Sequence, residues 1–339
     1  MNVTAAAGFT SRGLLAELSG NVGSINQKLT QVGEEVSTGL VSITFAGLGS
    51  GAQTALNLRP QMAQNDAISD GITAATSQMG FTQTIMTQIA AVAQSVLSSL
   101  SGTGGSGSGA SGVDSIAEQA RDAFNNVVGL LNSQDGDTYV FSGQDSGNPP
   151  VPSGSTASFV AGVTKAVQML GTPGTTVATT EAGSLNASMS GVFSTTVGQA
   201  TVQTVQTGQG SATMTYGVSA NASYMQQILQ SLATIGALSS KQTSTTGYST
   251  LVQDAGKQLA SATVSLTAAQ SVLGERQDEL VAIQGTMAST KVSLATQLSS
   301  VEDADVASLA TTQSLLQTQL QTSYKLISNM QNLSLVSYL

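Results

Sequence analysis

Apolar residues recur in steps of three and four over residues 15–36, which predicts a helix with one apolar stripe. The stripe consists of Leu15, Leu18, Val22, Ile25, Leu29, Val32 and Val36. A similar stripe near the C-terminal end of the sequence includes Leu309, Leu316, Leu320, Ile327, Leu333, Leu335 and Leu339. Because a single helix cannot bury its own stripe, we expect the two helices to pair with each other, with neighbouring copies, or with both. These residues are the candidate assembly interface.

The first helix is expected to end at Gly39, because glycine commonly follows the last turn of a helix. Residues 40–57 mix β-branched residues with several glycines, which predicts an irregular connector. Pro60 suits the first turn of a helix, and apolar residues keep the helical rhythm from there to Leu100. The sequence therefore predicts a second long helix.

Residues 101–112 are so rich in Gly and Ser that a flexible reversal is expected. Asp114 or Ser115 can then cap a third helix. The apolar stripe of that helix consists of Ile116, Ala120, Phe124, Val127 and Leu131.

The helical rhythm is lost over residues 143–222, which consist mainly of Thr, Ser, Gly and Val. Their charged residues are Asp145, Lys165 and Glu181, and short alternations such as TVQTVQT favour strands. We interpret this segment as a small insert of strands and turns, in which residues 158–170 could form a helix. A loosely ordered linker is the alternative.

Helical periodicity returns at Tyr224 and reaches its greatest length over residues 250–299. At about 1.5 Å per residue, that helix would span on the order of 70 Å. Its stripe includes Leu259, Ala262, Leu266, Ala269, Leu273, Leu280, Ile283, Met287 and Leu294. Such a length favours lengthwise pairing with another helix.

These patterns predict a mainly α protein: a long antiparallel helical rod that resembles a coiled coil, with paired N- and C-terminal helices and a small β-rich insert. Residues 1–40 and 300–339 are expected to form the assembly domain of paired terminal helices. Residues 41–142 and 223–299 are expected to form the rod domain, and residues 143–222 the variable insert.

The composition narrows the possible functions. Only 9% of the 339 residues are charged, against roughly 25% in an ordinary globular protein, so little charge must lose water when the surface is buried. The net charge is -9 and the ten Lys and Arg residues are scattered, so nucleic acid is not an expected partner. The sequence has no His and no Cys, which excludes zinc sites of those ligands and Ser-His or Cys-His catalysis. We expect no enzyme activity and no cofactor. No apolar run is long enough for a membrane span, and no cleavable signal peptide is expected.

Glu302, Asp303 and Asp305 lie within four residues and could form a metal or acid–base cluster. At the start of a helix, however, carboxylates more often cap the helix and complement its dipole. We therefore expect them to cap the last helix.

Two other patterns resemble ligand sites, but each lacks a feature that such a site requires. The glycines of SGTGGSG have a dinucleotide-binding spacing, but a helix rather than a strand precedes them. Asp135 and Asp137 begin like a calcium loop, but Tyr139 stands where an oxygen ligand is required.

Four short motifs carry a family resemblance. Residues 299–307 read SSVEDADVA and residues 36–40 read VSTGL. They are similar to the acidic C-terminal signature and the STG turn of bacterial flagellins and their hook-associated relatives. YVFSG at 139–143, followed by two prolines, and LSLVSYL at 333–339 resemble the family members that join the hook to the filament.

The resemblance covers residues 10–142 and 223–339. It implies a structural subunit of the bacterial flagellum, exported unfolded through the flagellar type III apparatus with an export chaperone and assembled outside the cell. The implied partners are further copies in a ring or helical assembly, flagellin, and another hook-associated protein. One departure stands out: the basic residues and Asp pair usual after the STG turn are missing, and residues 40–49 carry no charge.

Three alternatives remain open. Filament flagellin lies in the same class. A secreted adhesin-like binding module would use residues 143–222 as a head on a helical stalk. An enzyme, such as a glycosidase, would have to use Asp145 and Glu181 as its acid pair.

Overall fold

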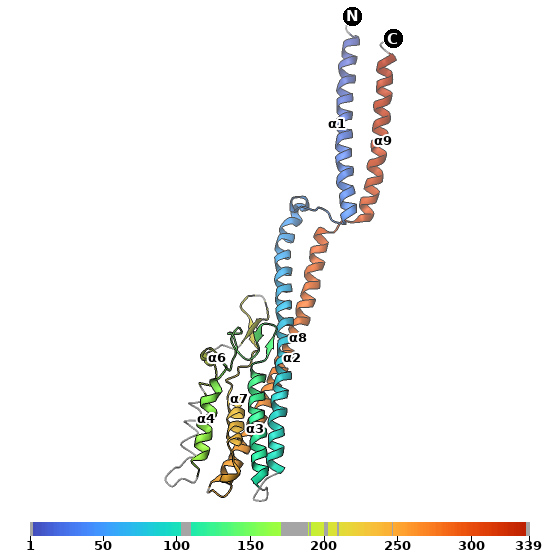
Figure 1. Cartoon of the computed structure of the whole chain (residues 1–339). Coiled ribbons are helices and arrows are strands. Elements are labelled where there is room, and N and C mark those ends of the chain that lie inside the picture. The colour runs from blue at the N-terminus through green and yellow to red at the C-terminus, as the bar shows by residue number, and fades with distance from the viewer. Residues whose placement is uncertain are drawn as a thin grey trace. The chain divides into compact units, whose positions relative to one another are not determined.

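The chain is built mainly from long helices (Figure 1). The computed structural model describes residues 3–102, 110–170, 189, 191–199, 203–208, 210–245 and 247–336. The helices are α1 (Val3–Thr38), the 3-10 helix η1 (Phe45–Gly51), α2 (Ala52–Gly102), α3 (Ala110–Leu131), α4 (Ser155–Gln168), α6 (Thr195–Gln199), α7 (Ser223–Gly236), the 3-10 helix η2 (Ser240–Gln242), α8 (Tyr248–Glu302) and α9 (Val306–Val336). Two antiparallel strand pairs join β1 (Gln134–Asp135) to β2 (Thr138–Tyr139) and β3 (Thr204–Gln206) to β4 (Thr213–Thr215). The predicted fold class, long paired helices with a small β-containing insert, is confirmed.

The chain divides into two compact units. Residues 1–65 and 289–339 form the terminal unit, and residues 66–288 form the central unit. The division between the two units falls inside α2 and inside α8.

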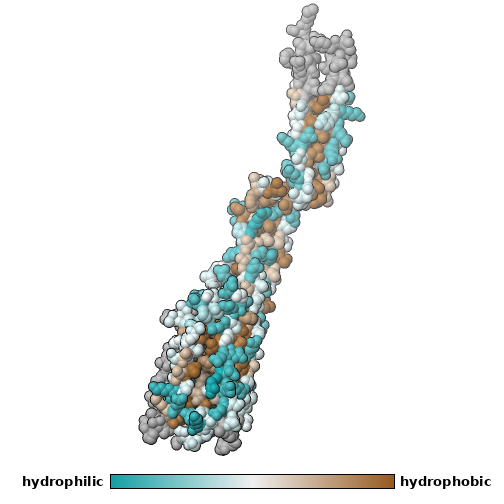
Figure 2. Space-filling model, viewed as in Figure 1, coloured by the Kyte–Doolittle hydropathy of each residue, from teal (hydrophilic) through white to brown (hydrophobic). Residues whose placement is uncertain are grey.

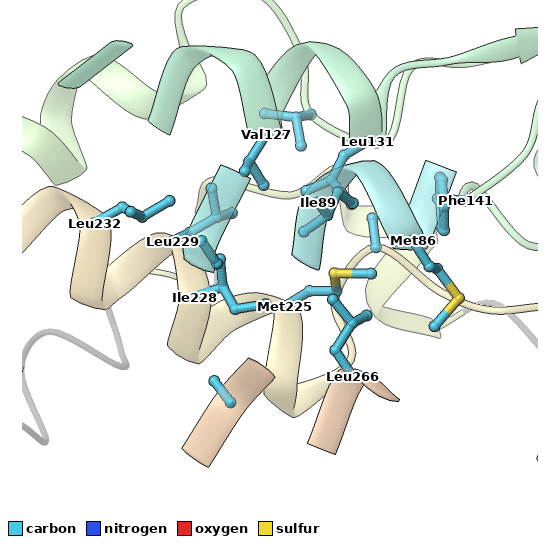
Figure 3. Close-up of a cluster of buried hydrophobic side chains, with 14 of the residues drawn as sticks. Met86, Ile89, Val127, Leu131, Phe141, Met225, Ile228, Leu229, Leu232 and Leu266 are labelled. Atoms are coloured by element: carbon cyan, nitrogen blue, oxygen red, sulfur yellow. The ribbon is translucent and has the colours of Figure 1, made fainter. Parts of the chain in front are cut away.

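The core of the central unit gathers side chains from α2, α3, α7 and α8 (Figure 3). Met86, Val127, Leu229 and Leu266 come from these four helices in turn, and each is fully buried. All five apolar residues predicted for the third helix are buried as well. The three-and-four spacing therefore identified the inward face of α3 correctly.

Within the central unit, α2 and α8 lie side by side in opposite directions. Gln284 Nε2 donates to Thr73 Oγ1 at 2.8 Å, and Gln270 Nε2 donates to Thr87 Oγ1 at 3.1 Å. The two contacts are therefore fourteen residues apart on each helix, in opposite directions along the chain. Midway between them, Gly80 faces Gln277. A partner that recurs every seven residues indicates coiled-coil-like packing.

The start of α2 differs from the prediction. The helix begins at Ala52, so Pro60 lies in its interior and the expectation of an irregular connector over residues 40–57 is wrong for residues 52–57. Residues 45–51 form a short 3-10 segment that is kinked at Gly49. Proline removes the N–H that would bond the carbonyl of Leu56. Leu56 is 56% exposed, so the proline lies on a part of α2 that is open to solvent, and the helix continues past it.

The start of α3 also differs. The helix begins at Ala110, and Asp114 lies inside it, so neither Asp114 nor Ser115 is the cap. The carboxylate of Asp114 instead accepts hydrogen bonds from the backbone N–H of Ser240 at 2.9 Å and from its hydroxyl at 2.7 Å. Part of the expected glycine-rich reversal, residues 103–109, lies outside the described residues, while residues 110–112 are helical.

The described part of the insert combines the helices α4 and α6 with a short hairpin. The helix expected within residues 158–170 is present as α4, and its Phe159 is buried and stacks on Phe124 of α3, with ring centroids 6.3 Å apart. The β3–β4 hairpin is held by Arg276 of α8, whose Nη1 donates to the carbonyl of Thr215 at 2.9 Å. Residues 171–188, with Glu181, lie outside the described residues. No described helix is both long and apolar enough to cross a membrane.

The contact of Asp114 with Ser240 makes part of the stability depend on pH. Hydrogen bonds from the backbone N–H and the hydroxyl of Ser240 lower the pKa of Asp114 below its ordinary 3.8. Because the folded pKa is depressed, this stabilisation is present above the unfolded value of 3.8 and is lost as the pH falls through the folded value. We expect Asp114→Asn to be less stable than wild type at neutral pH, by a difference in urea midpoint that shrinks in acid. Asp122→Asn, on the same helix, is the control, and a difference that persists unchanged in acid would contradict the assignment.

Candidate assembly interface

The helices α1 and α9 lie side by side in the terminal unit (Figure 1). They run in opposite directions, since the end of α1 and the start of α9 meet at an antiparallel bridge between Leu40 and Asp303. Figure 2 shows apolar residues along the line where the two helices meet, with polar residues on the flanks. The expected pairing of the terminal helices is therefore present within one chain.

Pairing covers the two apolar stripes only in part. Val32 and Leu316 are buried, with 8% and 7% of their surface exposed. The other described stripe residues are half-buried: Leu18, Val22, Ile25, Leu29, Val36, Leu309, Leu320 and Ile327. In contrast, the α8 stripe residues Leu259, Leu266 and Leu280 of the central unit have no exposed surface. The side chains of Leu15, Leu333 and Leu335, and all of Leu339, lie outside the described residues.

A tight turn fixes the base of the α1–α9 pair. Gly39 has a φ of 70°, a conformation that side-chain-bearing residues rarely adopt, and its N–H donates to the carbonyl of Glu35 at 2.8 Å. The N–H of Ala304 donates to the carbonyl of Gly39 at 2.9 Å, and the N–H of Val41 donates to the carbonyl of Glu302 at 2.7 Å. The glycine predicted to end the first helix thus also ties the connector to the α8–α9 junction.

The three acidic residues near this turn have different roles. Asp305 caps α9, because its Oδ1 accepts from the N–H groups of Ala307 and Ser308 at 3.1 and 3.2 Å. The expectation that Glu302 also caps the last helix is wrong, since Glu302 is the last residue of α8. Asp303 accepts a hydrogen bond from the hydroxyl of Ser299. Among the described residues, no cluster of His, Cys, Asp and Glu is arranged to hold a metal.

Glu302 is buried and neutralised by an arginine. Its Oε1 lies 2.8 Å from Nη2 of Arg59 and accepts from Nε of the same guanidinium at 3.0 Å. The guanidinium also lies over the ring of Phe45, 5.2 Å from its centroid. Arg59 is half-exposed and Glu302 has 7% of its surface exposed, so removing the arginine would leave a poorly hydrated carboxylate. The contact joins α2, the connector and α8 within the terminal unit.

The connector between α1 and α2, residues 39–51, exposes apolar side chains that lie outside the two predicted stripes. Ile43 is 70% exposed, and Val41 and Phe45 lie two residues to either side of it and are also exposed. The alternation in VSITF, in a segment without charge, was the available signal. Two exposed leucines and a tyrosine on α9 were missed as well: Leu315, Leu326 and Tyr324.

A shallow groove lies between the connector and the last turns of α1. It is lined by Gln31, Glu34, Glu35 and Thr38 of α1 and by Leu40, Val41, Ser42 and Ile43 of the connector. Within this connector groove, Nε2 of Gln31 donates to Oε1 of Glu35 at 2.9 Å. The lining therefore combines two carboxylates with an apolar wall.

The YVFSG motif is part of the central core rather than of a surface. Phe141 and Ser142 have no exposed surface, and the N–H of Ala220 donates to the carbonyl of Phe141 at 2.9 Å. Gly143 has a φ of 69°, which explains the glycine at the end of the motif. The motif thus fixes the chain where α3 passes into the insert.

Comparisons with known proteins agree with this architecture. Residues 13–145 match the bacterial flagellin N-terminal helical region, and residues 257–339 match the bacterial flagellin C-terminal helical region. The fold is similar to that of a Vibrio parahaemolyticus protein assigned as flagellar hook-associated, with a TM-score of 0.54, 12% identity, and coverage of 74% of this chain and 96% of that one. It is also similar to Bacillus cereus FlgL, with a TM-score of 0.48, 9% identity, and coverage of 72% and 99%. No curated protein matches the sequence.

Long paired helices with partly covered apolar stripes define a helical structural protein. The two family matches together cover more than half of the chain. The chain belongs to the family of bacterial flagellins and their hook-associated relatives, and is a structural component of the extracellular bacterial flagellum.

Proposed function

We propose that this chain forms the junction between the flagellar hook and the filament, and that it assembles through the apolar stripes of α1 and α9. Its neighbours are further copies of itself in a ring or helical array, flagellin, and another hook-associated protein. The subunit acts by packing and hydrogen bonding, without catalysis and without a cofactor.

The observation that carries this proposal is the incomplete burial of the two stripes. Eight of the described stripe residues are half-buried although α1 and α9 are already paired. Complete burial of a Leu, Ile or Val side chain stabilises by about 1.5–3 kcal/mol, so a half-covered side chain leaves about 1 kcal/mol to be gained. Summed over the stripes of several neighbouring copies, this gain is large enough to drive assembly.

A junction role, rather than a filament role, is supported by the resemblance of particular motifs. YVFSG at 139–143 and LSLVSYL at 333–339 are similar to family members that join hook and filament. The Vibrio parahaemolyticus protein of similar fold is assigned as hook-associated, which supports a place for this chain at the hook rather than along the filament.

The route to the flagellum follows from the same proposal. The chain leaves the cell unfolded through the flagellar type III apparatus, and an export chaperone covers its apolar segments before export. The low content of charged residues favours binding by a chaperone, because few ionised groups must lose water when the chaperone covers the chain.

The position of the labelled protein on cells tests the junction role. The natural sequence lacks cysteine, so Val264→Cys, at a side chain that is 70% exposed, provides one site for a maleimide dye. We expect one fluorescent spot at the base of each filament. A signal along the whole filament would assign the chain as filament flagellin and reject the junction role. The unsubstituted chain, treated with the same dye, is the control.

A further inference from the structure

Two surfaces of the terminal unit complement each other but belong to different sides of the α1–α9 pair. The first is the connector groove, in which Glu34 is exposed next to the apolar wall of Val41 and Ile43. Among the described residues, Glu34 has no ion-pair partner. The groove therefore offers a carboxylate and an apolar contact to a partner that carries a cation and apolar side chains.

The second surface is the outer face of α9. Lys325 is the only charged residue in the sequence of α9, and it is exposed. The half-buried Ser323 and Ile327 mark the side of α9 that faces α1. At about 100° per residue, Lys325 points to the opposite side.

Two large apolar side chains flank this lysine. Tyr324 and Leu326 are 52% and 49% exposed. The helix has 31 residues and a single charge, and that charge lies between two exposed apolar side chains. This segment therefore presents a cationic and apolar contact surface. No described carboxylate of the same chain forms an ion pair with Lys325.

We propose that the Tyr324–Leu326 segment of one copy docks in the connector groove of a second copy, with Lys325 beside Glu34 and Leu326 against Ile43. Charge complementarity selects this occupant: the groove holds carboxylates and the outer face of α9 holds a cation. Both surfaces are also apolar where they would meet. This contact deepens the assembly proposed above and rests on it.

The contact also fixes how two copies are displaced. Lys325 lies nineteen residues beyond Val306, the first residue of α9, or about 28 Å from the base of the pair. Glu34 lies four residues before Thr38, the last residue of α1, or about 6 Å from the same base. Two parallel copies therefore make the contact when they are shifted by about 22 Å along the helix axis. Copies at one level, as in a flat ring, would not make it.

Cross-linking tests the contact directly, because the natural sequence has no cysteine. Full-length Ile43→Cys and full-length Leu326→Cys are mixed and treated with a short bismaleimide, both as purified protein in concentrated solution and in flagella from cells that produce both variants. We expect a covalent dimer of one copy of each. Val264→Cys replaces Ile43→Cys in the control, since both wild-type side chains are 70% exposed.

Charge reversal tests the ionic part of the contact in the same assay. We expect Lys325→Glu, and separately Glu34→Lys, to lower the yield of the dimer by about fivefold, as for an exposed ion pair. The double variant Glu34→Lys with Lys325→Glu should restore the yield. Lys257→Glu makes the same charge change on an exposed position of the central unit and should have no effect.

The outcomes separate this contact from the assembly itself. If the protein locates to the hook–filament junction but residues 43 and 326 do not cross-link, the docking contact is wrong and the junction role stands. The contact is equally wrong if Ile43→Cys cross-links to a different protein, or if the double variant fails to recover. If the protein is absent from the junction but the charge-dependent dimer forms in solution, the contact stands and the junction role is wrong.

Discussion

Deletion of residues 315–339 should abolish motility in cells that depend on this chain, while the central unit stays folded. The deletion removes Leu316, Leu320 and Ile327, which cover the α1 stripe, and leaves the apolar face of α1 without its partner. We expect soft-agar swarming to fall to the level of cells without the chain. We also expect the truncated protein to be missing from sheared flagella.

A substitution series separates the apolar stripe from chain length. Leu316→Ser, Leu320→Ser and Ile327→Ser together should reproduce the loss of motility. Three exposed residues of the same helix, Gln319, Gln321 and Asn329, changed to Ser should leave motility intact. Normal swarming by the truncated chain would show that the terminal pairing is dispensable.

Phe141→Ala should destabilise the central unit by about 3–5 kcal/mol, the cost usual for removing a fully buried aromatic side chain. Phe141 has no exposed surface and belongs to the same buried core cluster as residues of α2, α3 and α7 (Figure 3). Its loss would leave a cavity at the point where the chain leaves the helical part for the insert. The similarity of YVFSG at 139–143 to other family members would then have a structural explanation, because the motif maintains the fold of the central unit.

Hydrogen exchange measures the loss of stability in the central unit alone. The slowest amides of α3 and α7 should exchange about 100-fold faster or more in Phe141→Ala, since each 1.4 kcal/mol changes the open population tenfold. Phe81→Ala is the matched control, because Phe81 is 37% exposed and belongs to the same unit. Equal effects of the two substitutions would show that Phe141 is not a core residue.

The sequence predicted the helices of this chain well where burial on one face is strong. The stripe of α3 and the long pattern of α8 follow the helical period without long interruptions. The α3 stripe is buried as expected, and the α8 stripe is buried except at Ala269, Ile283 and Met287, which are half-buried. Periodicity is reliable here because the burial of each apolar residue on the stripe stabilises the same orientation of the helix.

Helix boundaries were predicted less well, because distant contacts override local preferences. Pro60 suits a first turn, but the helix starts eight residues earlier at Ala52. Asp114 suits a cap, but its carboxylate bonds to Ser240, 126 residues away in sequence. Local rules cannot anticipate partners that only the folded chain supplies.

The candidate interface was predicted in part. The stripes of α1 and α9 were visible in the sequence, and because a single helix cannot bury its own stripe, incomplete burial in one copy was expected too. Their role as an assembly interface stays a prediction. The connector groove depends on hydrogen bonds that join Gly39 to Ala304 and Val41 to Glu302, and no periodic pattern reports such contacts. The role of Glu302 was missed for the same reason, since its partner Arg59 is 243 residues away in sequence.

The matched spacing of α2 and α8 in the central unit constrains how such a protein can change in length. Since Thr73 and Thr87 meet glutamines that are equally far apart on α8, a block of seven residues lost from both helices brings equivalent side chains together again. The loss of such a block from one helix alone would shift every later pair of side chains out of register. The distance that the two helices bridge is therefore adjustable in increments of about 10 Å, provided that both are shortened or extended together.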